Sequence, residues 1–472
     1  MASSGCWKCL TRPSVSATSP LTRAALPSLL RGTIAAPFST TASAAKNPLA
    51  GKAKKGTAAP PVRGTKTLRI KKKVPAKSTG RPPASGERKA MRKRIVLSNT
   101  NALEVQGLVD LDEKIMVDDS FIGRVVGIPG AVVDQLRTVE AFKTTQGWEL
   151  FRRPAFLVRK ESVEVSRLLE QSGGNKTTAK VVLDGSRGTG KSLMLLHAMA
   201  TAFIKGWVVI NIPEAQELTT AVTDYAPIDG TNPVLYSQNT YTANLLSQIS
   251  KSNSAVLSGL EITQQHTLPI PIPPKTTLAR LAELGARDPE LSWPIFKALW
   301  SELTAPGRPP LLMTLDSLNH IMRDSDYRSP EFELIHAHDL ALINHFVRYF
   351  SGNTQLPNGG AFMGAMSKSH APTSKALELA ISQKADVQDG KQVRAKDPFT
   401  KYDDRAFNSM QAVDLIRLKG LSKDEARGLM EYWAASGVLR SRIDERTVTE
   451  KWALSGNGVV GEIERGVLRM RI

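Results

Sequence analysis

Four short apolar runs recur along the middle of the chain, separated by longer stretches with helical spacing. Each run is rich in Val, Ile, Leu or Met and is bounded by glycine, proline or polar residues. Such runs are typical of strands that are buried on both faces of a parallel sheet. The runs are KVVLDG (180–185), GWVVINIP (206–213), LLMTLD (311–316) and GAFMGAM (360–366). The pattern predicts an α/β core, in which a parallel sheet is flanked by helices.

Helical spacing also dominates the region that precedes the first run. Apolar residues recur near the helical period in residues 131–151 and again in residues 152–172. We expect residues 99–175 to form an N-terminal helical and extended segment that packs on the core. The core domain itself is predicted over residues 176–395.

The C-terminal part of the chain is also predicted to be mostly helical. The stretch LSKDEARGLMEYWAASGVL begins with Ser422 in a capping position, carries acids in its first turn and ends at Gly437. We predict that residues 396–472 form a helical lid with a short β tail, or alternatively a small winged-helix-like module.

Charge is distributed very unevenly. Residues 1–94 contain 21 Lys and Arg but one acid, Glu87, whereas the remaining chain is close to neutral. Residues 1–45 are rich in Ser, Thr, Ala and Leu, with scattered arginines and no acid. This composition is typical of a mitochondrial transit peptide, and the continuous apolar core of a secretory signal is missing. The chain is therefore predicted to act in the mitochondrial matrix.

Residues 46–98 form a second basic segment with a different character. Lys, Pro and Gly dominate it, so it has too few apolar residues for a core and is predicted to be a disordered tail. Clusters such as Lys71–Lys73 can neutralise phosphates, which favours contact with RNA over the alternative of a solvated linker. Since no long uninterrupted apolar stretch occurs, no membrane-spanning helix is expected.

One motif carries the main candidate chemistry. The first apolar run continues into GSRGTGKS, which fits G-x-x-x-x-G-K-[ST], the pattern of a phosphate-binding P-loop. In such a loop, backbone N–H groups and a helix N-terminus surround the phosphates, the lysine reaches the terminal phosphates, and the hydroxyl binds Mg²⁺. The predicted cofactor-binding residues are Gly185, Ser186, Arg187, Gly188, Thr189, Gly190, Lys191 and Ser192.

A second group of candidates follows the later apolar runs. Asp316 closes the third run and is the best candidate for a second Mg²⁺ anchor, although a helix N-cap is the alternative role. Ser317 stands where many motor ATPases place a glutamate that activates water. Because this glutamate is missing, fast hydrolysis is not expected, and the catalytic residues are left unassigned. Ser367, just after the fourth run, is a candidate sensor of the terminal phosphate.

The base of the nucleotide is left open by the sequence. NKTT (175–178) lacks the acid of the [NT]-K-x-D loop that selects guanine, and QKAD (383–386) departs from it at the first position. GTP, GDP and ATP all fit the P-loop equally well.

The combination of the P-loop with WVVINIPEAQEL and LLMTLDSLNHIM resembles the death-associated protein three family, and the fungal members most. YSQNTYTANLLSQI and WALSGNGVVGEIERG extend the resemblance, which covers about Asp134 to the C-terminus. Members of this family are P-loop proteins in the head of the mitochondrial small ribosomal subunit, with a fold similar to AAA-type ATPases.

The resemblance implies a specific set of ligands and partners. It implies a guanine nucleotide, with Thr189 donating its backbone N–H and Asp316 facing Mg²⁺. The implied partners are small-subunit ribosomal RNA, neighbouring small-subunit ribosomal proteins and contacts that bridge to the large subunit.

Two classes of function follow from these observations. The first is a structural ribosomal protein that binds a purine nucleotide and supports mitochondrial translation, with at most slow GTPase or ATPase activity. The second is a free-standing AAA-like NTPase of the matrix, or a signalling protein whose nucleotide state controls its partners. Sedimentation with the small subunit distinguishes the first, and turnover near 1 per second or faster would favour the second.

Overall fold

The computed structural model describes residues 95–369 and 371–468. The predicted transit peptide (1–45) and most of the predicted basic tail (46–94) lie outside these residues. Within the described part of the chain, no helix is long and apolar enough to cross a membrane.

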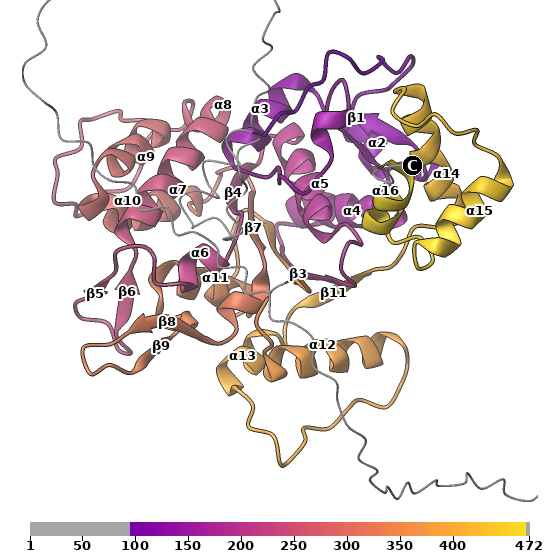
Figure 1. Ribbon diagram of the computed structural model, residues 1–472. Coiled ribbons are helices and arrows are strands. Elements are labelled where there is room, and N and C mark those ends of the chain that lie inside the picture. The colour runs from indigo at the N-terminus through magenta and orange to yellow at the C-terminus, as the bar shows by residue number, and fades with distance from the viewer. Residues whose placement is uncertain (1–94, 370, 469–472) are drawn as a thin grey trace, which may run out of the picture. The chain divides into compact units, whose positions relative to one another are not determined.

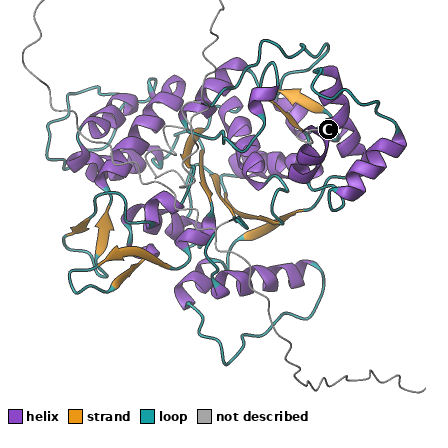
Figure 2. Ribbon diagram, viewed as in Figure 1, coloured by secondary structure: helices purple, strands orange, loops and turns teal. Residues whose placement is uncertain are grey.

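A parallel sheet of five strands forms the centre of the protein (Figures 1 and 2). The order of the strands across the sheet is β11-β3-β10-β7-β4, so the strand that enters the P-loop has a neighbour on each side. The strands are β3 (Thr178–Gly185), β4 (Val208–Ile212), β7 (Leu311–Asp316), β10 (Gly360–Ala365) and β11 (Asp414–Leu418). The four strands predicted from the apolar runs are all present, which confirms the predicted parallel α/β sheet.

The fifth strand, β11, was not predicted. It pairs only with β3, at one edge of the sheet, and lies within the range 396–472 that we assigned to the C-terminal region. The sheet therefore extends beyond the predicted boundary at residue 395. Its sequence, DLIRL, includes the charged residues Asp414 and Arg417. It therefore lacks the apolar run from which the other four strands were predicted.

Alternation along the strands supplies two separate hydrophobic cores. Val181 and Leu183 of β3 face one core, whereas Val182 between them faces the other. The same division holds in β4, where Val208 and Ile210 lie on one side and Val209 on the other. Because both faces are buried, most positions of these strands are apolar or small, which produced the runs seen in the sequence.

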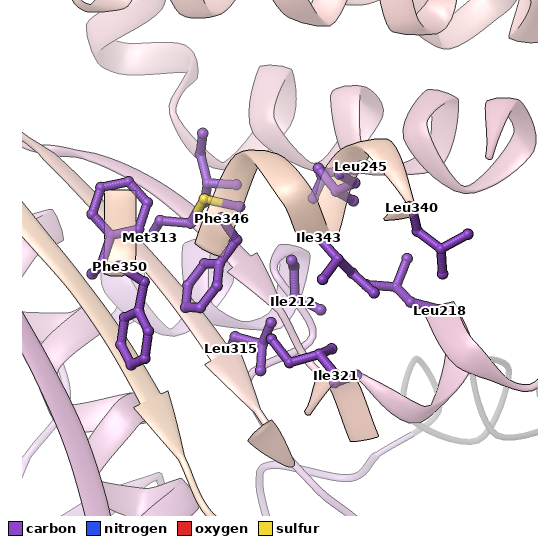
Figure 3. Packing of buried hydrophobic residues seen from close by; sticks show 14 of the residues in the cluster. Ile212, Leu218, Leu245, Met313, Leu315, Ile321, Leu340, Ile343, Phe346 and Phe350 are labelled. Carbon is purple, nitrogen blue, oxygen red and sulfur yellow. The ribbon is translucent and has the colours of Figure 1, made fainter. Parts of the chain in front are cut away.

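Helices cover both faces of the sheet (Figure 1). The P-loop helix and the N-terminal segment cover one face: α2 (Glu113–Val117), α3 (Gly130–Thr138), α4 (Lys160–Gly174) and α5 (Lys191–Ile204). The other face is covered by α6 (Gln216–Thr219), α7 (Asn239–Ser252), α8 (Ser254–Leu257), α9 (Leu278–Arg287), α10 (Pro289–Leu303), α11 (Ala341–Phe350), α12 (Lys375–Gln388) and α13 (Asp404–Ser409). Figure 3 shows this second core, with Phe346 of α11 lying beside Met313 of β7.

The C-terminal region packs around a third, smaller core. It contains α14 (Lys423–Ala435), α15 (Glu445–Leu454) and α16 (Val460–Leu468), packed through residues such as Trp433 and Ile463. Ser422 caps α14 in a capping box with Glu425, as its sequence predicted. The predicted short β tail is wrong, because the last described segment of the chain, up to Leu468, is the helix α16. Among the described residues no strand follows β11, so the strands of a winged helix are not found either.

Short antiparallel pairs and single turns complete the fold. The pairs are β1 (Val125–Gly127) with β2 (Ala155–Leu157), β5 (Ala226–Ile228) with β6 (Leu235–Ser237), and β8 (Asp324–Arg328) with β9 (Leu334–His336). The 3₁₀ turns are η1 (Asp119–Phe121), η2 (Trp148–Leu150), η3 (Leu318–Ile321) and η4 (Ala337–Asp339).

The first predicted helix is much shorter than expected. The apolar spacing over residues 131–151 predicted one continuous helix, but α3 ends at Thr138. Glu140 follows with a φ of 56°, a left-handed conformation that a helix cannot contain. Residues 139–147 instead form an irregular turn whose apolar side chains, including Phe142, still point into the core. The buried side chains of this turn recur at intervals close to the helical period, and this spacing led to the prediction of a longer helix.

Buried histidines make the stability of the fold depend on pH. His197 of α5 is 2% exposed, and this burial lowers its pKa to about 4. Its Nε2 lies 2.9 Å from Ser166 Oγ and 3.1 Å from Ser162 O. The ring is therefore neutral in the folded protein at a pH where it is protonated in the unfolded chain.

We expect acidification from pH 7 to pH 5 to lower the free energy of unfolding by about 2 kcal/mol through His197 alone, because the unfolded state binds the proton first. The folded pKa lies below the unfolded value, so this stability is complete above about pH 6.5 and is lost as pH falls. His197→Gln, which keeps a polar side chain but does not titrate, should lose correspondingly less stability. Denaturant titration at both pH values measures the difference, and equal losses would contradict a neutral buried imidazole.

Candidate nucleotide site

The predicted P-loop lies at the carboxyl edge of the parallel sheet. β3 ends at Gly185, the turn occupies residues 186–190, and α5 begins at Lys191. Gly188 and Gly190 have φ values of 80° and 95°, which residues with a side chain rarely adopt. The strand, tight turn and helix that a P-loop requires are all in place, at the edge where open parallel sheets bind their ligands.

The N-terminus of α5 is free of side-chain capping. Its N-cap residue is Gly190, and no side chain accepts a hydrogen bond at this cap. The first N–H groups of a helix have no partner within the helix, and the helix dipole is positive at this end. α5 therefore presents unsatisfied donors and a favourable potential to an anion bound in the turn.

Lys191 points back into the loop. Its Nζ donates hydrogen bonds of 2.8 Å to the carbonyl oxygens of Gly185 and Ser186. Burial lowers the pKa of Lys191, and the nearby carboxylate of Asp184 opposes that shift. The ammonium lies among the backbone groups of the turn, where it can exchange these carbonyl acceptors for phosphate oxygens.

The other residues of the motif divide into buried and exposed positions. Thr189 is buried, and its Oγ1 donates to Ser186 O at 2.9 Å, which closes the turn. Ser186, Arg187 and Gly188 are exposed on the outer side of the loop. Arg187 thus adds positive charge beside the turn.

Ser192 and Asp316 are in direct contact. Ser192 Oγ donates to Asp316 Oδ2 at 2.6 Å, which joins the start of α5 to the end of β7. The other oxygen, Oδ1, accepts from Ser317 N at 2.7 Å. The N-cap of η3 is Ser317, with a φ of 66°, and Asp316 is the last residue of the strand. Asp316 therefore does not act as the N-cap, which was the alternative role for this residue.

Ser367 lies at the same edge of the sheet, just beyond β10. Its backbone N donates to Asn319 Oδ1 at 2.8 Å, and its hydroxyl donates to Ser369 O at 3.2 Å within its own turn. Lys368 forms an ion pair of 3.4 Å with Asp184. The hydroxyl of Ser367 is thus engaged locally, and Lys368 brings a further positive charge to the site.

Three further residues, which no sequence pattern indicated, make contacts at this site. The ammonium of Lys143, from the turn after α3, forms an ion pair with Asp316 Oδ2. Arg159, at the N-cap of α4, donates from Nη1 to Thr189 O and from Nη2 to Lys419 O, each at 2.8 Å. Gly461 N, in α16, donates to Gly188 O at 2.9 Å. These residues are far from the motif along the chain, so no local pattern marks them.

The residues present fit a magnesium nucleotide in part. A hydroxyl and a carboxylate that touch each other are ligands of the kind that Mg²⁺ uses together with phosphate oxygens. No group of three or more His, Cys, Asp or Glu in the described residues is arranged to hold a metal by itself. Asp316 is already neutralised by Lys143, so Mg²⁺ at this position has to compete with an ammonium group.

The fold and the motif define an α/β protein with a P-loop sequence at the carboxyl edge of its sheet. The chain matches the family model described as mitochondrial ribosomal death-associated protein 3 over residues 156–466. It belongs to this family, which confirms the resemblance seen in the sequence and the predicted mitochondrial location.

Curated relatives support the same assignment. The chain is similar to the small ribosomal subunit protein mS29 of Neurospora crassa, with 48% identity over 99% of each chain. It is also similar to mS29 of Schizosaccharomyces pombe, with 22% identity over 68% of this chain and 67% of that protein. A solved structure, the ORC2 protein of Aeropyrum pernix in its ADP form, is similar with 14% identity and a TM-score of 0.34 over 65% of this chain and 61% of that one.

We expect Arg159→Met to lower the free energy of unfolding by about 2–4 kcal/mol, because it leaves the buried carbonyl oxygen of Thr189, and the partly buried bond to Lys419 O, without their charged donor. Chemical denaturation measures the loss, and amide hydrogen exchange should accelerate at residues 186–190. Arg427→Met is the matched control, since the side chain of Arg427 is 53% exposed and pairs with Glu431 on the surface of α14. Similar effects of both substitutions would refute a specific role for Arg159.

Proposed function

We propose that the protein is a structural component of the mitochondrial small ribosomal subunit that holds a purine nucleotide in its P-loop. The ribosomal part rests on the 48% identity, over nearly the whole of both chains, to a protein named as a small ribosomal subunit protein. The nucleotide part rests on the geometry of the turn between β3 and α5, which combines an uncapped helix N-terminus with the inward-pointing Lys191. Through this role the protein would support mitochondrial translation.

The proposed ligand is GTP or GDP, with ATP as a further candidate, because nothing in the described site selects the base. The turn of residues 186–190 and the first N–H groups of α5 would surround the phosphates, and Lys191 would bind the terminal ones. Where Mg²⁺ is bound, Ser192 and Asp316 are the residues that would hold it, in competition with the ammonium group of Lys143, and it would neutralise phosphate charge.

Hydrolysis is proposed to be slow or absent. Ser317 follows Asp316, and its backbone is held in a left-handed conformation by the bond from its N–H to Asp316 Oδ1. A serine hydroxyl at this position is a poor substitute for a carboxylate as a general base at neutral pH. The site is therefore suited to retaining a nucleotide and not to rapid turnover.

The proposed partners follow from charge and from family membership. Residues 1–94 carry a net charge of +20 and the remaining chain one of −1, and the part of this segment beyond the transit peptide is proposed to contact small-subunit ribosomal RNA. Neighbouring small-subunit proteins and contacts that bridge to the large subunit are proposed for the folded part. The basic tail lies outside the described residues, so its composition is what supports this part.

We expect Lys191→Ala to lower nucleotide affinity by about 10- to 100-fold, since each lost hydrogen bond to a charged phosphate is worth about 1.5–3 kcal/mol. The measurement is extraction and identification of nucleotide from purified mitochondrial small subunits that carry the wild-type or the variant chain. The wild type should yield close to one purine nucleotide per copy, and the variant should yield little and should impair subunit assembly. Lys251→Ala, at an exposed position near the end of α7, is the matched control.

Three results would contradict the proposal, each in a different part. Recovery of the mature protein only in RNA-independent complexes would exclude the ribosomal role. Normal nucleotide content with Lys191→Ala would exclude the P-loop as the binding site. Turnover by the isolated protein near 1 per second or faster would favour the alternative of a free matrix NTPase.

A further inference from the structure

Lys143 occupies a position that nucleotide sites with Mg²⁺ usually leave to the metal. Its ammonium and the hydroxyl of Ser192 both contact the same oxygen, Asp316 Oδ2. The side chain of Asp316 is 8% exposed and that of Lys143 is 27% exposed, so the carboxylate is buried while the lysine side chain is partly accessible to solvent. A cation from the protein is therefore already in place beside the candidate metal ligands.

The backbone of Lys143 is fixed by a compact turn. Gln146 Oε1 accepts from Lys143 N at 2.9 Å and also from Trp148 Nε1 at 2.6 Å. Phe142 packs edge-on against Trp148, with 5.0 Å between the ring centroids, and both rings are buried. Because the neighbours on both sides are held in this way, the side chain of Lys143 is directed by the fold and is not a freely moving surface group.

The turn is also tied to the sheet beside Asp316. Asn211 Nδ2, in β4, donates to Val139 O at 2.7 Å at the start of the turn. Asn211 Oδ1 accepts from Thr314 Oγ1 at 2.7 Å, and Thr314 lies on β7 two residues before Asp316. The side chains of Asn211, Thr314 and Asp316 are all buried. β7 therefore positions the carboxylate of Asp316 and, through Thr314 and Asn211, also the turn that carries Lys143.

We propose that Lys143 is a built-in counter-cation of the nucleotide site, which competes with Mg²⁺ for Asp316 and makes nucleotide binding nearly independent of the metal. The inference rests on the proposed nucleotide binding at the same site. An ammonium group is a compact charge with three donors, so it can serve a carboxylate and a phosphate oxygen together. The ammonium group repels a divalent cation beside it and already neutralises the negative charge of Asp316 that would attract the metal.

This role is specific to Lys143 among the basic residues at the site. Lys191 bonds to carbonyl oxygens of the loop, and Lys368 pairs with Asp184. Neither of them forms an ion pair with Asp316 in the described structure. Lys143 is thus a positioning residue for the nucleotide phosphates, and its removal should change the metal dependence of binding and not only its strength.

The test measures the dissociation constant of fluorescent GDP and ADP analogues for the full mature chain, in excess Mg²⁺ and in excess EDTA. We expect the wild type to differ by less than about threefold between the two conditions. With Lys143→Met, Asp316 becomes available to Mg²⁺, so we expect binding to be at least about tenfold tighter with Mg²⁺ than with EDTA. Lys143→Arg retains the charge and should restore the weak dependence of the wild type.

Lys368→Met is the matched control, because it removes a cation from the same edge without freeing Asp316. It should weaken binding in both conditions alike, and circular dichroism establishes that each variant is folded. Equal and weak metal dependence in Lys143→Met would overturn the inference while leaving nucleotide binding intact. Strong metal dependence in the wild type would do the same, whereas no binding of either analogue under any condition would reject the proposed function itself.

Discussion

The parallel pairing of β10 with both β3 and β7 is the interaction on which the candidate site depends. Ala365 of β10 lies level with Leu183 of β3 and with Asp316 of β7. This register brings the end of the P-loop strand, the carboxylate and the turn at Ser367 to one edge, although they are far apart along the chain. A shift of β7 by one residue would turn each of its side chains toward the opposite core and would move Asp316 away from Ser192, so the packing on both faces enforces the register.

Both ends of the folded chain also contact the P-loop. Arg159 joins Thr189 O to Lys419 O, and therefore connects the loop to the segment that follows β11. From the other side, Gly461 N donates to Gly188 O, so α16 rests directly on the turn. A side chain at Gly461 would meet the backbone of Gly188 at 3.3 Å, which explains the absence of one at this close approach. The loop is consequently the point where the sheet, the N-terminal segment and the C-terminal helices meet.

The sequence predicted the parts of the fold whose cause is local. Burial on both faces left apolar runs at β3, β4, β7 and β10, and the P-loop motif carries its own turn and helix start. β11 carries two charged residues, Asp414 and Arg417, so its apolar signature was weaker, whereas β4 at the opposite edge is buried throughout and kept its run. Lys143 and Arg159 were missed for another reason: each acts through a contact with a residue far away in the chain, and such contacts exist only once the fold is known.

The same contacts connect the proposed nucleotide to the stability of the protein. A ligand that binds only the folded state stabilises it by about 4 kcal/mol at a concentration a thousand times its dissociation constant. Here the ligand would replace the loop carbonyls as partners of Lys191 and would satisfy the free donors of α5. Because Arg159 and α16 hold the outer side of that loop, the gain would extend to the C-terminal helices. A nucleotide that serves as part of a structure needs charge compensation that does not dissociate, and the ammonium group of Lys143 supplies it. Rapid phosphate chemistry instead needs an exchangeable metal and a base beside it.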